Sequence, residues 1–325
     1  MENARSVLRK RAQWAMRRAP LPLHLTTGSF SLRCADKAGV TRTRTGAKDL
    51  VTVSRGIRIP LASAPTGPAA LRAYTELDDE SVLSVGSAAR LWAVPLPGRL
   101  EEDWRIHVAR RRGSSPPRRV NVVGHLLTFL PDEVVELDGV RLTSPGRTWL
   151  DLARVLSVDE LVVAGDALAC EHGPEFPAPC EALCGVEELR AMVARHPGSR
   201  GVRKARAAVE LIRVGADSPP ETRLRLALIR AGLPEPVLNH VVWGNAGVPV
   251  LWPDAAYPEW RIAVKYEGAH HNGQDQYLRD IRRADAAASS GWLEVRVSRL
   301  DLAGEYPAAV RKVRAALESR GWRAR

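Results

Sequence analysis

The residues with the clearest capacity for chemistry lie in one stretch, WPDAAYPEWRIAVKYEGAHH, at positions 252–271. It holds Asp254, then Lys265 and Glu267, then two adjacent histidines. Carboxylates on adjoining strands can converge on Mg²⁺, which prefers oxygen ligands and keeps several waters, so that two carboxylates can suffice. The bound ion polarises a phosphate and lowers the pKa of the attacking water. The stretch therefore predicts Mg²⁺-dependent phosphodiester hydrolysis, with Asp254 and Glu267 as metal ligands.

These residues need a particular order of elements to position them. The segment SPPETRLRLALIRAGL predicts a helix, with Ser218 at its cap and Leu224, Leu228 and Ala231 along one side. Strands over PVLNHVVW, VPVLWPDAAY and EWRIAVKYEG follow, and GNAG between the first two is typical of a hairpin turn. A helix over DQYLRDIRRADAAASSG, a strand over WLEVRVS and a closing helix complete the order. The order αβββαβα is the restriction-endonuclease-like core of the PD-(D/E)xK superfamily.

Three motifs strengthen this prediction: SPPETRLRLALIRAGLPEP, WPDAAYPEWRIAVKYEGAHH and RDIRRADAAASSGWLEVRV. They resemble the endonuclease-like domains related to very-short-patch mismatch repair, over about the last third of the chain. The resemblance implies a metal aspartate at Asp254, an accessory glutamate at Glu221 and a histidine that assists the attacking water. His271 best matches that histidine, and His270 is the alternative. A contact with phosphate, or a cap on the following loop, is the simpler role for either one.

Lys265 departs from the pattern of these relatives. Strand alternation places Lys265 and Glu267 on one face, yet the related domains usually carry Glu-x-Asp before the glycine. In one interpretation Lys265 stabilises developing negative charge and Glu267 reaches the metal. The repair enzymes agree with it, because they lack a carboxylate at the first position and use the backbone carbonyl at the position of Tyr266. In the other interpretation, the Lys265 ammonium occupies the space of the metal ion, and the domain binds DNA without cutting it.

The energetic cost of the second arrangement is large. A unit charge ~4 Å from the cation costs about 4 kcal/mol at an effective dielectric near 20. That cost corresponds to about three orders of magnitude in metal affinity. Lys265 therefore decides between an active and an inactive site.

A basic ridge on the next predicted helix offers a DNA contact. Arg279, Arg282 and Arg283 fall on neighbouring turns, so their guanidinium groups can contact phosphates and position DNA without reading its sequence. A solvated helix face is the simpler interpretation of the same pattern.

The N-terminal half carries a second DNA-binding pattern. A helix over SLRCADKA, a turn at Gly39 and a second helix from Thr41 precede an alternating hairpin over DLVTVSRGIRI. This order predicts a winged helix-turn-helix whose second helix enters the major groove. Its exposed cations would be Arg42, Arg44 and Lys48. A small helical domain with a glycine turn is the structural alternative.

A mixed α/β middle region is predicted by strands over DWRIHVARRR and RRVNVVGHLLTF, followed by two helices within LTSPGRTWLDLARVLSVDELVVAGDALA. Thr143 or Ser144 could cap the first of these helices. The motifs KAGVTRTRT, RGIRIP, SAARLWAVPLP and LTSPGRTWLDLA look like the AbiEi-type antitoxin and transcriptional regulator family, over roughly the first half of the chain. That resemblance implies DNA binding and repression, often autoregulatory, with a cognate toxin as a further partner.

Composition agrees with a nucleic-acid partner. Lys and Arg outnumber Asp and Glu by 48 to 37 in 325 residues, for a formal charge of +11, which favours a polyanion ligand. An Arg-rich proteome is the simpler explanation. Four cysteines make no disulfide framework, and no apolar run is long enough to span a membrane, so we expect a cytoplasmic protein. Cys170, His172, Cys180 and Cys184 offer four zinc ligands, but their spacing matches no zinc module, so ordinary thiols are expected.

The sequence thus predicts a multidomain α+β protein. Its segments are a basic extension (1–24), a winged helix-turn-helix (25–62), an AbiEi-like middle domain (63–165), a helical connector (166–216) and an endonuclease-like domain (217–325). The expected function is DNA binding with Mg²⁺-dependent endonuclease activity. The alternative is a transcriptional repressor or antitoxin of a type IV toxin–antitoxin pair, whose nuclease fold is inactive.

Overall fold

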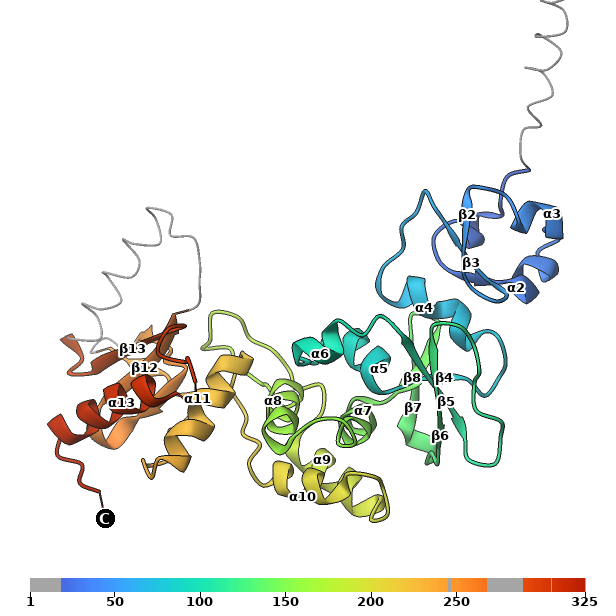
Figure 1. Ribbon diagram of the computed structural model, residues 1–325. Coiled ribbons are helices and arrows are strands. Elements are labelled where there is room, and N and C mark those ends of the chain that lie inside the picture. The colour runs from blue at the N-terminus through green and yellow to red at the C-terminus, as the bar shows by residue number, and fades with distance from the viewer. Residues whose placement is uncertain (1–18, 245–246, 268–288, 305, 325) are drawn as a thin grey trace, which may run out of the picture. The chain divides into compact units, whose positions relative to one another are not determined.

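The computed structural model describes residues 19–244, 247–267, 289–304 and 306–324 (Figure 1). It is a mixed α+β protein with several separate sheets, as expected from the sequence. The chain divides into two compact units, one of residues 1–91 with 104–143 and one of residues 92–103 with 144–325. Within the part of the chain that the structure describes, no helix is long and apolar enough to cross a bilayer. The finer division into five segments stays a prediction.

The first unit begins with the expected order of two helices and a hairpin. The elements are η1 (Leu23–Leu25), β1 (Phe30–Ser31), α2 (Leu32–Lys37), α3 (Arg42–Thr45), β2 (Leu50–Ser54) and β3 (Ile57–Pro60). The hydroxyls of Ser31 and Thr41 cap the two helices by accepting the backbone N–H of the third residue that follows. Gly39 takes φ +73° at the turn between them. Strands β1, β3 and β2 form one antiparallel sheet.

A five-stranded sheet in the order β6-β5-β4-β8-β7 completes the first unit. Its strands and adjoining helices are α4 (Gly67–Thr75), β4 (Val82–Leu83), α5 (Val85–Leu91), β5 (Ile106–Arg111), β6 (Val122–Leu127), η2 (Pro131–Glu133), β7 (Val134–Leu137) and β8 (Val140–Thr143). The two expected strands β5 and β6 are confirmed, and they run parallel. The short strand β4 directly precedes α5.

The second unit opens with a group of helices: α6 (Gly98–Glu101), α7 (Pro145–Leu152), α8 (Val158–Leu168), α9 (Val186–Arg195) and α10 (Val202–Val209). Ser144 rather than Thr143 caps α7, because its hydroxyl accepts the backbone N–H of Arg147. Trp149 lies wholly inside this group and donates its indole N–H to the carbonyl of Leu161 at 2.8 Å. The indole therefore ties α7 to α8.

The C-terminal part of this unit comprises α11 (Pro219–Arg230), β9 (Val242–Trp243), β10 (Pro249–Leu251), β11 (Ala255–Tyr257), η3 (Pro258–Trp260), β12 (Ile262–Glu267), β13 (Leu293–Ser298) and α13 (Pro307–Ser319). β12 pairs antiparallel with β11 and parallel with β13. One core holds Leu224 and Leu228 of α11, Val264 of β12 and Val313 of α13. The apolar side predicted for α11 is therefore confirmed.

Two strand predictions in this part were wrong. VPVLWPDAAY does not form one strand: β10 pairs with β9 in a two-stranded sheet, and β11 belongs to the three-stranded sheet. Pro253 lies between them and has no N–H for a ladder hydrogen bond. In PVLNHVVW only Val242–Trp243 is a strand, and Asn239 takes φ +53°, outside the extended region. The helix expected between β12 and β13 falls outside the described residues.

Candidate functional site

Asp254, just before β11, contacts Lys265 of the neighbouring strand β12. Asp254 immediately precedes β11, whose first residue, Ala255, pairs with Val264 of β12. The Lys265 ammonium donates to one carboxylate oxygen of Asp254 at 2.5 Å, and the backbone N–H of Tyr266 donates to the other at 2.6 Å. Both oxygens of the predicted metal aspartate are therefore engaged by donors from β12. The Asp254 side chain is 13% exposed and that of Lys265 is 39% exposed.

Glu221 lies in the first turn of α11 and belongs to the same cluster. It accepts the Ser218 hydroxyl at 2.7 Å and the backbone N–H of Asp217 at 2.9 Å. Burial, and next the negative charge of Asp254, raise the pKa of Glu221 to about 7. Burial also raises the pKa of Asp254, while Lys265 acts in the opposite direction. The site thus brings together two partly buried carboxyl groups and one ammonium, and perturbed groups of this kind gather at functional sites.

Glu267, the second predicted metal ligand, ends β12 and has its own cationic partner. A carboxylate oxygen lies 3.2 Å from a guanidinium nitrogen of Arg296 on β13. Glu267 is exposed, in contrast to Asp254. Arg296 also contacts Glu294, so the guanidinium connects two acidic side chains along the sheet.

These contacts bear on whether the residues fit Mg²⁺. Among the described residues, Cys170, His172 and Cys180 form a group whose ligand atoms all lie within 4.8 Å of one another, and no such group of three contains Asp254 or Glu267. Each of those two carboxylates contacts a cationic side chain instead. A Mg²⁺ ion at Asp254 would therefore meet the positive charge of Lys265, which opposes its binding. His270, His271 and the three arginines of the predicted ridge, Arg279, Arg282 and Arg283, lie outside the described residues.

The three cations predicted for DNA contact in the first unit differ in their surroundings. Arg44 is only 10% exposed, so the expectation of exposure was wrong for this residue. Its guanidinium makes two hydrogen bonds to Asp49, at 3.0 and 2.9 Å, and this bidentate pair draws it inward. Arg42 is exposed and pairs with Asp36, and Lys48 is exposed. Arg42 and Lys48 are therefore the accessible cations of the three.

Sequence reasoning missed a buried ion pair between α8 and α11. Asp166 and Arg225 are both wholly buried and joined at 2.8 Å. Asp166 also accepts the Thr222 hydroxyl and the backbone N–H of Arg213, each at 2.8 Å. A lone aspartate within the apolar run VVAGDALA was the available signal, because a charge on a buried helix face needs a partner.

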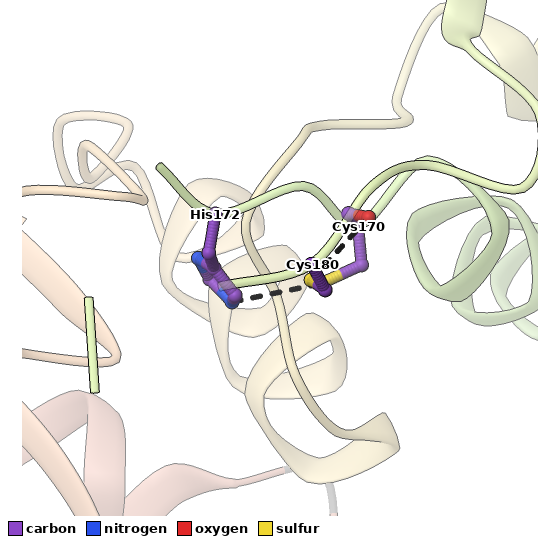
Figure 2. A group of neighbouring side chains, drawn as sticks. All are labelled: Cys170, His172 and Cys180. Carbon is purple, nitrogen blue, oxygen red and sulfur yellow. Dashed lines mark hydrogen bonds between the residues drawn. The ribbon is translucent and has the colours of Figure 1, made fainter. Parts of the chain in front are cut away.

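The cysteine region also differs from the expectation. Cys170, His172 and Cys180 approach one another (Figure 2), but Cys184 is buried elsewhere and directs its thiol to the carbonyl of Gly185. Asp217, which the sequence did not single out, lies 2.6 Å from the imidazole of His172.

Comparisons with known proteins give little functional information. No family model matches the chain, and no solved structure matches it. Two uncharacterised proteins of Mycobacterium tuberculosis, from strains CDC 1551 / Oshkosh and ATCC 25618 / H37Rv, are each 30% identical over 158 residues. The match covers 48% of this chain and 54% of each relative, so the chain spans about half the length of the curated relatives it matches. Their names carry no activity that could be transferred.

Proposed function

We propose that this protein binds DNA as a transcriptional repressor or antitoxin, and that its C-terminal region is an endonuclease-like scaffold that does not cut. The observation that carries the proposal is the arrangement around Asp254, whose two carboxylate oxygens accept the Lys265 ammonium and the Tyr266 N–H. A divalent cation bound to that carboxylate would have to lie beside the Lys265 ammonium. The net charge of +11 supports a polyanionic ligand.

The magnitude of the electrostatic effect favours this proposal over cleavage. An ammonium ~4 Å from a divalent ion costs about 4 kcal/mol per unit charge at an effective dielectric near 20. Most of that cost must be met before Asp254 can bind a metal, and Glu267 is held by Arg296 rather than directed to the same point. DNA binding needs no such rearrangement.

A Mg²⁺-dependent nuclease is the second candidate, and one observation favours it. Glu221, whose pKa is raised to about 7, is close enough to Asp254 to feel its negative charge, and both side chains are partly buried. The position of Glu221 at the N-terminus of α11 explains its two hydrogen bonds but not the second carboxyl group near it. Two partly buried acids and an ammonium are the groups that a phosphodiester-cleaving site would use.

Calorimetry with Mg²⁺ and Mn²⁺ separates the two candidates. We expect the wild type to bind neither ion measurably. Lys265→Glu should bind them, with an affinity higher by about three orders of magnitude, because this change removes the ammonium and adds a carboxylate. The double variant Lys265→Glu/Asp254→Ala is the control and should lose the gain. Metal binding by the wild type, with cleavage of duplex, mismatched or single-stranded DNA that Asp254→Ala abolishes, would establish the nuclease instead.

DNA binding is tested separately, in a chelator, with the duplex that lies upstream of the protein's own coding region. We expect fluorescence anisotropy to detect specific binding by the wild type. Arg42→Ala and Lys48→Ala should weaken it and each lower the slope of log K against log salt by about 0.9, the value for one lost phosphate contact. Arg206→Ala, on the exposed side of α10, removes the same charge and should leave the slope unchanged. Equal effects of all three variants would show that DNA binding depends on the net charge of the protein and not on contacts by Arg42 and Lys48.

A further inference from the structure

A short loop between α8 and α9 is folded so that three potential metal ligands face one another. The backbones of His172 and Cys180 form an antiparallel bridge, with N–H to carbonyl distances of 2.9 and 3.2 Å. The bridge closes the intervening segment GPEFPAP, and Phe176 from that segment stacks on the His172 imidazole at 4.5 Å. Cys170 precedes the bridge by two residues. Backbone pairing therefore fixes the relative positions of two thiols and one imidazole (Figure 2).

The distances between the donor atoms agree with ligands of one small ion. The Cys170 thiol lies 3.6 Å from Nε2 of His172 and 4.0 Å from the Cys180 thiol. A tetrahedral zinc site with Zn–S near 2.3 Å and Zn–N near 2.0 Å has S–N and S–S separations of about 3.6 and ~3.8 Å. These two edges of the tetrahedron are thus already formed by the side chains.

A fourth donor comes from a distant part of the sequence. One carboxylate oxygen of Asp217 lies 2.6 Å from Nε2 of His172 and 3.3 Å from the Cys170 thiol. The S–O edge of a tetrahedral zinc site is about 3.5 Å, and its N–O edge about 3.4 Å. The imidazole and the carboxylate must therefore separate by about 0.8 Å to admit an ion between them. The exposed side chain of Asp217 can make this movement.

We propose that Cys170, His172, Cys180 and Asp217 bind one Zn²⁺ ion. Thiolates, an imidazole and a carboxylate are its usual ligands, and four protein donors make a closed, structural site. The sequence had suggested Cys184 as the fourth ligand and disfavoured zinc on spacing. The structure replaces Cys184 with Asp217, a residue that no spacing rule within the cysteine segment could include.

A disulfide between Cys170 and Cys180 is the competing explanation for their approach. It would use two of the four converging groups and give no role to the other two. His172 is only 8% exposed, and its Nε2 already faces both a thiol and a carboxylate. A single ion with four ligands accounts for all four side chains.

The proposed zinc ion would stabilise the segments that position Glu221 and Asp254. The backbone N–H of Asp217 holds Glu221, so fixing the Asp217 side chain also fixes the start of α11. The same loop accepts hydrogen bonds from Asn239, through the carbonyl of Glu171 at 2.7 Å, and from the Trp252 indole, through the carbonyl of Glu175 at 2.8 Å. Zinc would thus join the loop after α8 to the segments that carry Glu221 and Asp254.

Metal analysis of the full chain, purified without chelator from zinc-supplemented cells, tests the proposal. We expect about one zinc per wild-type chain, as in closed four-ligand sites. In Cys180→Ser and Asp217→Asn, competition with a chromophoric chelator should show affinity lower by at least on the order of 10-fold. Cys184→Ser is the matched control from the same segment and should keep the metal. Loss of zinc in Cys184→Ser equal to that in Cys180→Ser would overturn the ligand assignment.

A second measurement on the wild type avoids reliance on variants that fail to fold. Replacing zinc with Co²⁺ should give the thiolate charge-transfer absorption and the strong visible bands of a tetrahedral site. Wild-type protein that holds no zinc and shows no such bands on cobalt addition under reducing conditions would refute the site. So would a Cys170–Cys180 disulfide found by mass spectrometry in protein purified from the reducing cytoplasm.

Discussion

Two carboxylate–cation pairs in the second unit have the same chemistry and opposite surroundings. Asp166 and Arg225 are wholly buried between α8 and α11, and Asp166 accepts three hydrogen bonds. Asp254 and Lys265 join β11 to β12, with the ammonium partly in solvent. Removing one partner of a buried pair leaves a charge that water cannot reach. Lys265 is 39% exposed, so its ammonium can instead move into water and leave Asp254 to another cation.

The two carboxylates differ in how firmly they are held. Asp166 is fixed by donors from Arg213, Thr222 and Arg225, all of which lie in or just before α11. Asp254 has two donors, and one of them is a flexible side chain. The first arrangement sets where α11 lies against α8. The second joins the residue just before β11 to strand β12.

The largest effect is expected from Asp166→Asn. The change removes the buried carboxylate 2.8 Å from Arg225 and leaves only the 41% exposed Glu235, 3.6 Å away, as its acidic neighbour, so the free energy of unfolding should fall by about 3–5 kcal/mol. Urea denaturation followed by circular dichroism measures the loss. Asp159→Asn in the same helix is the control: its partner Arg230 is exposed, and the loss should stay below about 1 kcal/mol. Equal losses of unfolding free energy in the two variants would show that burial does not determine how much each ion pair contributes.

A smaller effect, of a different kind, is expected from Lys265→Met. Asp254 loses one donor, which costs about 1–2 kcal/mol at a partly buried acceptor. Millimolar Mg²⁺ should then raise the thermal midpoint of the variant, because an ion that binds only the folded state stabilises it. The midpoint of the wild type should not respond.

Lys312→Met supplies the matched control for this prediction. Lys312 lies 2.7 Å from Asp301, and the two side chains are 48% and 12% exposed, close to the values for Lys265 and Asp254. A response to Mg²⁺ only in Lys265→Met would assign the metal effect to the cluster with Glu221. A response in both variants, or in neither, would contradict a latent metal site at Asp254.

The smallest effect is expected at a third pair, Glu160 with Arg99. The hydrogen bond from Arg99 lowers the pKa of Glu160 from 4.5 to about 2. A lowered folded-state pKa gives stability that is present above the unfolded value and is lost as the pH falls through the folded value. As the pH falls below 4.5, the free energy of unfolding should thus fall further in the wild type than in Glu160→Gln. The difference between the two should stay below about 1 kcal/mol, because Arg99 is exposed. Parallel acid limbs would show that the pair contributes nothing.

The sequence predicted local features well where adjacent residues determine them. The short helices over SLRCADKA and from Thr41, the turn at Gly39 and the apolar side of α11 all follow from short patterns and are present. The sequence also put Asp254 close to the strand of Lys265, and in the structure Asp254 lies just before β11, which pairs with β12. It failed over VPVLWPDAAY, because an apolar run does not show that Pro253 ends one sheet and a different sheet begins.

The candidate site was predictable only in part, for a physical reason. Residue types and strand order indicated Asp254, and the resemblance to endonuclease-like domains implied Glu221; in the structure the charge of Asp254 contributes to the raised pKa of Glu221. Asp217 was not predictable, because its contact with His172 joins segments far apart in sequence. The inward position of Arg44 was missed as well, since it depends on the bidentate pair with Asp49.

By itself, the sequence determined the class of chain: a basic, mixed α+β protein with capped helices and alternating strands. Those properties depend on residues within one or two turns of each other, so local patterns carry them. Only the tertiary structure decided which charges meet. The energy of a charge depends on its burial and on partners brought by chain closure. That is why Lys265 lies on Asp254, Arg225 on Asp166 and Asp217 on His172.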